Sequence, residues 1–305
     1  MAVTAAMVKE LRERTGAGMM DCKNVLVETD GDMDKAIDLL REKGLAKAAK
    51  KAGRIASQGL VKLSFAEDGK TASIIEVNSE TDFVAKNPEF IDFVQKLADI
   101  ARTNDAADVE ALKTLPYDAE GTVGETLTAK ISKIGENMSI RRFVKYDRPG
   151  TVYVGYIHNG GLIGVIVGFE TEASVGEIEE MGKDVCMQVC SMSPKFIDQS
   201  SVDPAYLASE KEILIQQALN EGKPQAIVEK MVVGRLKKEL QEVCLVNQKF
   251  VKDNEMTVEQ YVNAKAKELG KSIKVVEMVR YEVGEGIEKK VENFAEEVAK
   301  QMAGK

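Results

Sequence analysis

The chain has four cysteines and one histidine, the thiol and imidazole groups that most often ligate zinc or take part in nucleophilic catalysis. Cys186 and Cys190 are spaced to share one face of a helix, but a structural zinc ion needs four ligands and no others follow nearby. Cys22 and Cys244 stand alone, no C-x-x-C pair occurs, and a disulfide framework would be unusual in a cytosolic chain of this length. We therefore predict four buried thiols and neither a metal ion nor another cofactor.

The histidine and two lysine-containing loops do not fit catalytic motifs either. His158 is the only imidazole, so an H-E-x-x-H zinc site is excluded, and its place at the end of a predicted strand favours a structural role. The sequences GKT at 69–71 and GKS at 270–272 resemble the end of a phosphate-binding loop, but Ser64 and Lys265 occupy the position of its first glycine. The chain is therefore predicted not to be an enzyme.

The net charge of the chain bears on whether it binds nucleic acid. The chain has 305 residues, with 42 Lys and Arg against 50 Asp and Glu, and a net charge of −8. Nucleic-acid binding needs excess cations to displace the counterions of phosphates, so no direct nucleic-acid partner is expected. The basic stretch 43–54 has no aromatic residue to stack on bases and is predicted to be a solvated helix.

Two further observations concern membranes and export. The longest apolar run, Leu162–Phe169, has the length of a strand, far short of a membrane span. Charged residues interrupt the N-terminal stretch 1–21, where a signal peptide needs an apolar core. We therefore expect a soluble cytoplasmic protein.

Helical spacing and glycine breaks predict a small three-helix bundle at the start of the chain. Thr4 caps a first helix that ends near Arg14, a second helix covers 19–28, and Asp32 caps a third that ends at Gly44. A bundle of this size buries little apolar surface, so it would be only marginally stable alone.

Beyond residue 55 the pattern becomes that of strands. Two strands, Gly59–Phe65 and Thr71–Asn78, are joined by the turn sequence EDG, and a helix starts at Pro88. An exposed loop at 103–122 and a helix to about residue 133 follow. Three more strands are predicted at Ser139–Tyr146, Thr151–His158 and Leu162–Phe169.

A weak internal repeat relates two parts of this region. The sequence IIEVNSETD, which ends at Asp82, aligns with GVIVGFETE, which ends at Glu172, and the helices that follow also align. The middle of the chain is therefore predicted to hold two related strand–strand–helix units. The second copy has Ala173 where the first has Phe83, so it lacks the aromatic side chain.

Residues 203–243 are predicted to form an antiparallel helical hairpin around the turn sequence NEGKP. Its apolar seam is thin, so the hairpin is expected to project from the body of the protein. The residues assigned to this seam at heptad spacing are Leu207, Leu214, Ala226, Val233, Leu236, Leu240 and Val243. A helix at 257–269, a strand at 273–282 and an amphipathic helix around 287–302 complete the prediction.

These elements predict an α+β protein with antiparallel sheets and a duplicated core. The expected units are a helical head at 1–54, a first core subdomain at 55–140, a second at 141–200 with 244–270, an inserted hairpin at 201–243, and a C-terminal strand and helix at 271–305.

Three stretches together resemble bacterial elongation factor Ts: MVKELRERTGAGMMDCK near the start, VNSETDFVAKNPEF at 77–90, and KIGENMSIRRF at 133–143. The order of parts is similar over essentially the whole chain. The resemblance implies a guanine-nucleotide exchange factor that binds elongation factor Tu, in its GDP-bound and nucleotide-free forms, during translation. It also implies a head with a ubiquitin-associated-like fold, a hairpin that supports a homodimer, and a C-terminal helix that touches the GTPase.

The resemblance assigns partner contacts to two sets of residues. Met19 and Met20 would face the partner from the head. The T-D-F-V sequence would insert beside the partner's magnesium and phosphate region and comprises Thr81, Asp82, Phe83 and Val84. From the residues alone, the default is Phe83 and Val84 in the core, and a capping role for Thr81 or Asp82. For Asp82 and Phe83 the resemblance favours partner contact over these default roles. For Met19 and Met20, helix geometry already requires one of the two to point away from the bundle core.

Two other function classes remain open at this point. One is a helical-hairpin adaptor or chaperone that has no GTPase partner. The other is an enzyme that binds a small molecule through the glycines of 160–168, although these glycines lie within strands and not at a strand-to-helix turn. Release of labelled GDP from elongation factor Tu would separate the three classes.

Overall fold

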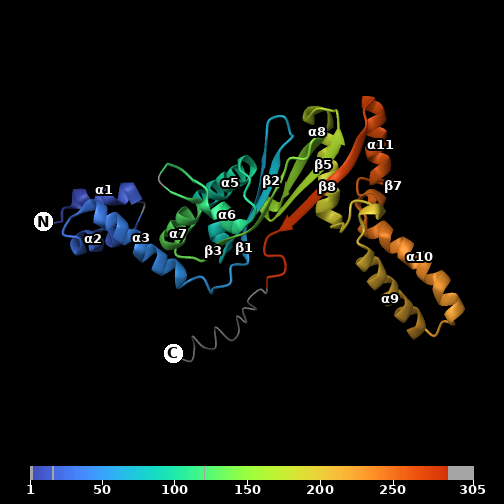
Figure 1. Ribbon diagram of the computed structural model, residues 1–305, viewed down its shortest axis with the longest axis horizontal. Coiled ribbons are helices and arrows are strands. Elements are labelled where there is room, and N and C mark those ends of the chain that lie inside the picture. Colours follow the sequence, from blue (N-terminus) through green and yellow to red (C-terminus); the bar gives the residue numbers. More distant parts are fainter. Residues whose placement is uncertain (1–2, 16, 120, 288–305) are drawn as a thin grey trace.

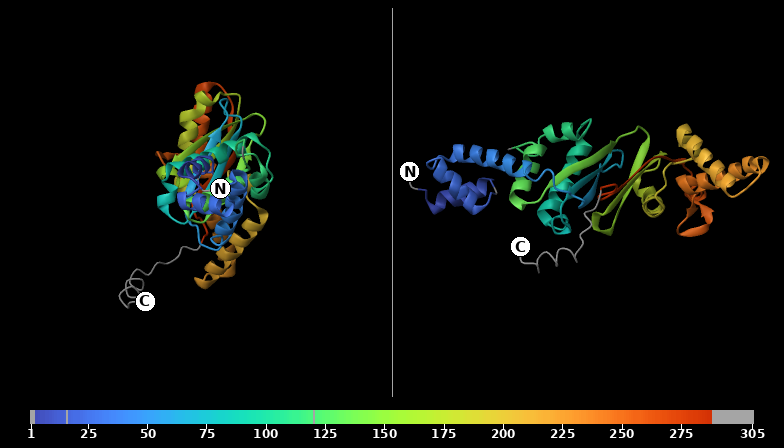
Figure 2. Two further views of the ribbon diagram at one scale, coloured as in Figure 1. Left: turned by 90° about the vertical axis from the view of Figure 1, so that its left-hand side faces the viewer. Right: turned by 90° about the horizontal axis from the view of Figure 1, so that it is seen from below.

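The computed structural model describes residues 3–15, 17–119 and 121–287. The molecule is elongated, as Figures 1 and 2 show, with a helical head at one end, two β-sheets in the middle and a helical hairpin at the other end. The mixture of helices and antiparallel sheets confirms the α+β class.

The head consists of α1 (Ala5–Thr15), α2 (Met19–Glu28) and α3 (Met33–Ala49). Asp32 caps α3 as predicted, accepting a hydrogen bond from the Lys35 backbone N–H at 3.1 Å. The predicted end of α3 at Gly44 is wrong, because the leucine, alanines and lysine that follow are strong helix formers and carry the helix on to Ala49. The longer helix brings the head to the core, where Gly44 faces Ser132.

The first sheet has the strand order β1-β2-β3, and all its pairs are antiparallel. Apolar residues of α5 pack on one face of this sheet, and Asn87 caps α5 by accepting from the Glu89 N–H at 2.9 Å. The loop predicted at 103–122 is only partly correct, because Leu112 is fully buried and anchors the short helix α6. The elements are β1 (Gln58–Phe65), β2 (Ala72–Ser79), α4 (Asp82–Ala85), α5 (Pro88–Thr103), α6 (Val109–Thr114), α7 (Val123–Ile134) and β3 (Met138–Tyr146).

The second sheet has the order β4-β5-β8, again antiparallel. Its central strand β5 leads into α8, just as β2 leads through α4 into α5, so the two sheets share an order of elements. The elements are β4 (Thr151–His158), a 3₁₀ turn (Asn159–Gly161), β5 (Ile163–Thr171), α8 (Val175–Met192), α11 (Val258–Leu269) and β8 (Ile273–Glu282).

Two expected boundaries do not match this pairing. The boundary at residue 140 falls inside β3, which pairs with β2 along its whole length and therefore belongs to the first sheet. The strand placed in a separate C-terminal module pairs with β5 as β8, so it belongs to the second sheet. Strand pairing joins residues far apart in sequence, which local patterns do not reveal. The helix predicted around 287–302 lies almost wholly outside the described residues.

The two sheets pack face to face, and helices cover their outer faces (Figure 1). Val61 and Ile74 of the first sheet share one buried cluster with Tyr153 and Ile166 of the second. A Cβ on Gly164 would lie 2.4 Å from Val61, so this glycine allows the sheets to approach closely. The glycines of β5 therefore have a packing role, which argues against the small-molecule site considered for 160–168.

The hairpin consists of α9 (Pro204–Asn220) and α10 (Gln225–Val243) and projects from the body (Figure 1). The predicted heptad seam is partly wrong: Val233 is 68% exposed, because the inward face of α10 follows Val228 and Val232, one residue earlier. The side chain of Ala226 lies outside the described ones. The remaining short elements are 3₁₀ turns at Gln199–Ser201 and Leu245–Asn247, and the strands β6 (Lys249–Phe250) and β7 (Asp253–Thr257).

Candidate partner-binding site

An exposed aromatic side chain stands directly after the central strand of the first sheet. Phe83 is 81% exposed, although it lies between a fully buried strand and the buried Val84. A large apolar side chain so exposed costs solvation free energy that folding alone does not recover, and such residues often mark interaction sites. The default placement of Phe83 in the core is therefore wrong, and that of Val84 is confirmed.

The backbone explains why neighbouring side chains point in opposite directions. We call residues Thr81–Val84 the Phe83 turn; it contains the cap and most of α4, a helix of a single turn. Thr81 is the N-cap, and its hydroxyl accepts from the Val84 N–H at 3.4 Å. Successive residues of a helical turn are about 100° apart, so Val84 packs into the core cluster while Phe83 faces solvent.

Asp82 carries a charge at the surface of the same turn. Its carboxylate pairs with the Lys86 ammonium at 2.6 Å, one helical turn later. The hydrogen bond from Lys86 holds the pKa of Asp82 below its ordinary value. Asp82 is therefore ionised at neutral pH, and its side chain is available at the surface next to Phe83.

The head carries two further exposed apolar side chains. Met19 and Met20, the first two residues of α2, are 59% and 63% exposed, although helix geometry required only one of them to leave the bundle core. The core of the head is made instead by residues such as Leu11 and Leu26. The methionines and the Phe83 turn lie on different parts of the molecule, so the structure does not bring them into one cluster.

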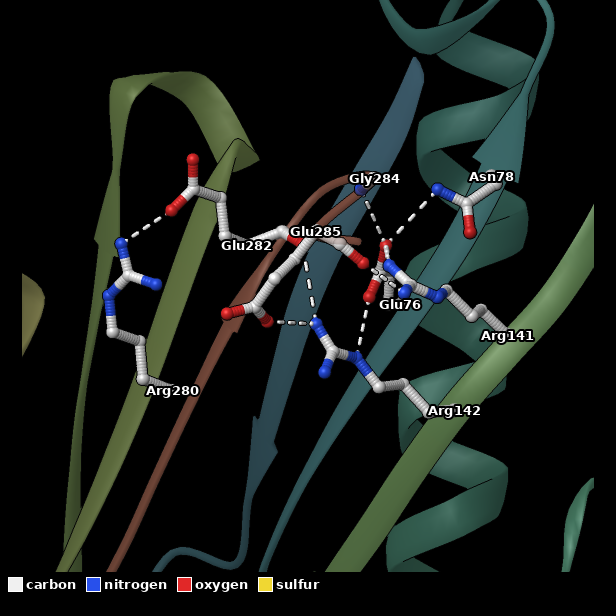
Figure 3. A network of polar contacts seen from close by, with 8 residues as sticks. All are labelled: Glu76, Asn78, Arg141, Arg142, Arg280, Glu282, Gly284 and Glu285. Carbon is white, nitrogen blue, oxygen red and sulfur yellow. Dashed lines mark hydrogen bonds and ion pairs between the residues drawn. The ribbon is translucent and has the colours of Figure 1, made fainter. Parts of the chain in front are cut away.

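A buried carboxylate connects the first sheet with the end of the second. Glu76 of β2 has no exposed surface, and Figure 3 shows it enclosed by polar groups from three segments. Its Oε1 accepts from Arg141 at 3.0 Å and from the Gly284 N–H at 2.8 Å, and its Oε2 accepts from Arg142 at 2.7 Å. Asn78 adds a further hydrogen bond at 3.1 Å. Two arginines therefore compensate one buried charge.

The same network fixes the chain just beyond β8. Arg142 also pairs with Glu285 at 2.9 Å. Gly284 has φ of +71°, and a Cβ there would lie 2.3 Å from the Ser57 carbonyl oxygen, so only glycine fits. The head linker, the first sheet and the segment after β8 therefore meet at this point.

Comparison with known proteins gives the family. The family described as Elongation factor TS matches residues 80–285. Proteins named Elongation factor Ts from Clostridioides difficile (strain 630) and Clostridium botulinum (strain Alaska E43 / Type E3) are 57% and 54% identical over 300 residues, covering 98% of this chain and 99% of each relative. Another so named, from Clostridium kluyveri, is 54% identical over 305 residues. This chain belongs to the elongation factor Ts family.

As a member of the elongation factor Ts family, the chain is a translation elongation factor. The family match covers the Phe83 turn and the Glu76 network's partners on β3 and after β8. It begins beyond the head, although the full-length relatives extend over the head as well.

The cysteines and the histidine lie outside the sites described above. All four cysteines are buried free thiols, and burial raises their pKa values, as at Cys22 and Cys244. His158 is exposed at the end of β4, and its Nδ1 lies 2.9 Å from the Tyr156 hydroxyl, so the imidazole has a hydrogen-bond partner within its own strand. Among the residues described, no group of three acidic, cysteine or histidine side chains could hold a metal ion. Within the same residues, no helix is long and apolar enough to span a membrane.

Sequence reasoning missed the residue that contacts the cap of the Phe83 turn. Glu136, in the stretch KIGENMSIRRF, contacts Thr81 although 55 residues separate them in the chain. The stretch was one of the three that carry the family resemblance, but no local pattern connects it with the Phe83 turn.

Proposed function

We propose that this chain binds elongation factor Tu and promotes the release of GDP from it, with the Phe83 turn as the part that disturbs the partner's magnesium and phosphate site. The observation that carries the proposal is the 81% exposure of Phe83 on an otherwise well-packed core. Family membership supports the choice of partner.

Nucleotide release needs no covalent chemistry. A GTPase holds GDP through contacts to its phosphates and to Mg²⁺. A protein that binds the nucleotide-free form more tightly than the GDP form must weaken GDP binding by the same coupling free energy. This mechanism requires shape and charge at the interface and no nucleophile, base or cofactor of its own. We therefore propose that the chain is an exchange factor and catalyses no chemical reaction.

Phe83 suits this role because its aromatic ring is rigid and apolar. Aromatic side chains dominate the binding free energy of many interfaces when they enter a pocket of the partner. Asp82 would bring an ionised carboxylate to the same place, where it could compete for polar contacts near the partner's metal ion. Thr81 and Val84 would hold the turn, the first as cap and the second by packing.

Two further contacts are part of the proposal. Met19 and Met20 would give the head its own apolar contact with the GTPase, and their exposure supports this. The hairpin would support a homodimer, since Ile213, Ile227 and Val233 on it are exposed although their side chains are large and apolar.

The experiment is release of a fluorescent GDP analogue from elongation factor Tu. We expect a small amount of this protein to accelerate release of the label from a large excess of the GTPase, because an exchange factor turns over. A hairpin adaptor or chaperone without a GTPase partner would leave the release rate unchanged, and that result would contradict the proposal.

A further inference from the structure

The carboxylate of Glu136, in the loop between α7 and β3, contacts Thr81, the cap of the Phe83 turn. Its Oε1 accepts from the Thr81 hydroxyl at 2.7 Å, and its Oε2 accepts from the Thr81 backbone N–H at 3.0 Å. Both oxygens are therefore bound to one residue. Charge-assisted hydrogen bonds of this kind are stronger than those between neutral groups.

The two hydrogen bonds that Thr81 accepts from α4 are long in comparison, whereas the Lys86 N–H at the end of the helix donates to the Asp82 carbonyl at 3.0 Å. The Val84 N–H donates to the Thr81 hydroxyl at 3.4 Å, and the Ala85 N–H donates to the Thr81 carbonyl at 3.4 Å. A helix of four residues has also not recovered the entropy cost of its first turn. The start of the turn at Thr81 therefore depends on groups outside it.

The base of the turn is held by the next residue of the same stretch. The Asn137 N–H donates to the carboxylate of Glu80, and the Asn137 amide donates to the Arg54 carbonyl at 2.7 Å. Glu80 therefore fixes the chain just before the turn, and this contact also involves the linker from the head. Glu136 fixes Thr81 itself, one residue closer to Phe83.

Phe83 contributes little to its own placement. Because its ring is 81% exposed, packing against this protein restrains it weakly. The position of the ring is therefore set mainly by the backbone conformation from Thr81 through Asp82 to Phe83. An interface residue is most effective when its bound conformation exists before binding, since ordering it during association costs free energy.

We propose that Glu136 is a positioning residue for Phe83: by binding both polar hydrogens of Thr81, it holds the turn in the conformation that presents the ring to the partner. This inference rests on the proposed function, in which Phe83 acts on elongation factor Tu. It gives a role to the stretch KIGENMSIRRF, which the proposed function leaves without one.

The test is a double-mutant cycle in GDP release. Glu136→Ala should slow stimulated release about tenfold, and Glu136→Gln should restore part of it, because the amide oxygen still accepts one of the two hydrogen bonds from Thr81. In a Phe83→Ala background the same Glu136→Ala change should slow release less than twofold. Gln260→Ala removes a capping hydrogen bond of 2.8 Å from α11 and should leave release unchanged, which controls for the loss of a helix cap as such.

Hydrogen exchange of the turn in the free protein is measured alongside. The Val84 and Ala85 amides should exchange faster in Glu136→Ala than in the parent protein. Unchanged protection there would overturn the inference without reference to any partner. Should Glu136→Ala melt early, Glu136→Asp keeps the charge, withdraws the carboxylate by one methylene, and should also slow release.

The two proposals fail in different ways. Normal release by Phe83→Ala would overturn the proposed function of the turn. Slow release by Phe83→Ala together with normal release by a folded Glu136→Ala would overturn only the positioning role. An equal loss from Glu136→Ala with and without Phe83 would also overturn it, since Glu136 would then act elsewhere.

Discussion

Each of the two central strands, β2 and β5, has a threonine at or just after its end. The hydroxyl of Thr81 accepts from the Val84 N–H at 3.4 Å, and that of Thr171 accepts from the Ala173 N–H at 3.0 Å. The chains then diverge. In the first sheet a single helical turn presents Phe83 to solvent, whereas in the second the aligned residue is Ala173, which is 3% exposed and packs in the core. Two segments at corresponding places in the two sheets thus differ, since one presents a side chain to solvent and the other closes a core.

The supports of the two turns differ in the same way. Helix α8 begins with a local capping box, in which Glu177 accepts from the Ser174 N–H at 2.8 Å. The Phe83 turn has its acidic partner 55 residues away, at Glu136. The cap of α8 is closed by adjacent residues, with Lys271 as a further partner of Glu177. The cap of the Phe83 turn is instead held by Glu136, from the loop between α7 and β3.

The strands that lead to the two turns also differ inside the core. Where β2 has the buried Glu76, the aligned residue of β5 is Ile166, which is 1% exposed. At this position only β2 therefore has a charge to satisfy, and the two arginines that pair with it bring in the segment after β8.

The largest effect that we expect comes from removing this charge. Glu76→Ala leaves Arg141 and Arg142 without their common partner, and breaking a buried pair costs about 3–5 kcal/mol. The lower end, about 3 kcal/mol, is expected because the arginine side chains are 25% and 30% exposed and water can solvate them partly. Thermal melting is the measurement.

Glu76→Gln is the matched control. It keeps one oxygen that accepts from Gly284 or Arg142, but it loses the charge and replaces the second acceptor by an NH2 group. It should therefore melt between Glu76→Ala and the parent protein. Equal melting of Glu76→Ala and the parent protein would show that the network contributes nothing to the fold.

A smaller loss of stability is expected from a change just before α8, in the second sheet's part of the chain. Ala173→Phe places the ring of the first turn at the aligned position of the second, where the side chain is buried. Overpacking should destabilise the protein by about 1–3 kcal/mol, and the ring should not enhance GDP release. Melting and release assays check this. A stable variant with faster release would show that either turn can present a ring.

The smallest effect that we expect is on the acid titration of Glu177 and Asp82, the carboxylates at the starts of α8 and α4. The hydrogen bond from Lys271, together with those from Ser174, lowers the pKa of Glu177 from 4.5 to about 2. Because the folded-state pKa is lowered, the stabilisation from this group is present above pH 4.5 and is lost as the pH falls through about 2. Carboxyl chemical shifts followed by NMR should show a midpoint near 2.

Lys271→Met should raise that midpoint toward the ordinary value and leave the titration of Asp82 unaffected. Asp82 should itself titrate below its ordinary value, because of Lys86, and Lys86→Met should raise its midpoint. A Glu177 midpoint near 4.5 in the parent protein would mean that the capping contacts do not persist in solution.

Local signals predicted much of the fold. The bounds of α2 match the prediction, and Asp32 and Asn87 start α3 and α5, because a cap and the apolar spacing after it are encoded within a few residues. The prediction at Gly44 was wrong because one glycine costs only about 1 kcal/mol, which the helix formers after it and contact with the core offset.

The long-range contacts could not be read in this way. The pairing of β8 with β5, the Glu76 network and the Glu136–Thr81 contact join residues that are remote in the chain. The exposure of Phe83 was expected only from the family resemblance, since a phenylalanine beside a buried strand is by default a core residue.

The most direct test of the account is Phe83→Ala, assayed for melting and for stimulated release of labelled GDP from elongation factor Tu. The account predicts an unchanged thermal midpoint and a loss on the order of 2 kcal/mol in the interaction, or roughly 30-fold in release. A variant that melts far lower yet releases GDP at the normal rate when folded would contradict it, because Phe83 would then stabilise the fold and not act on the partner.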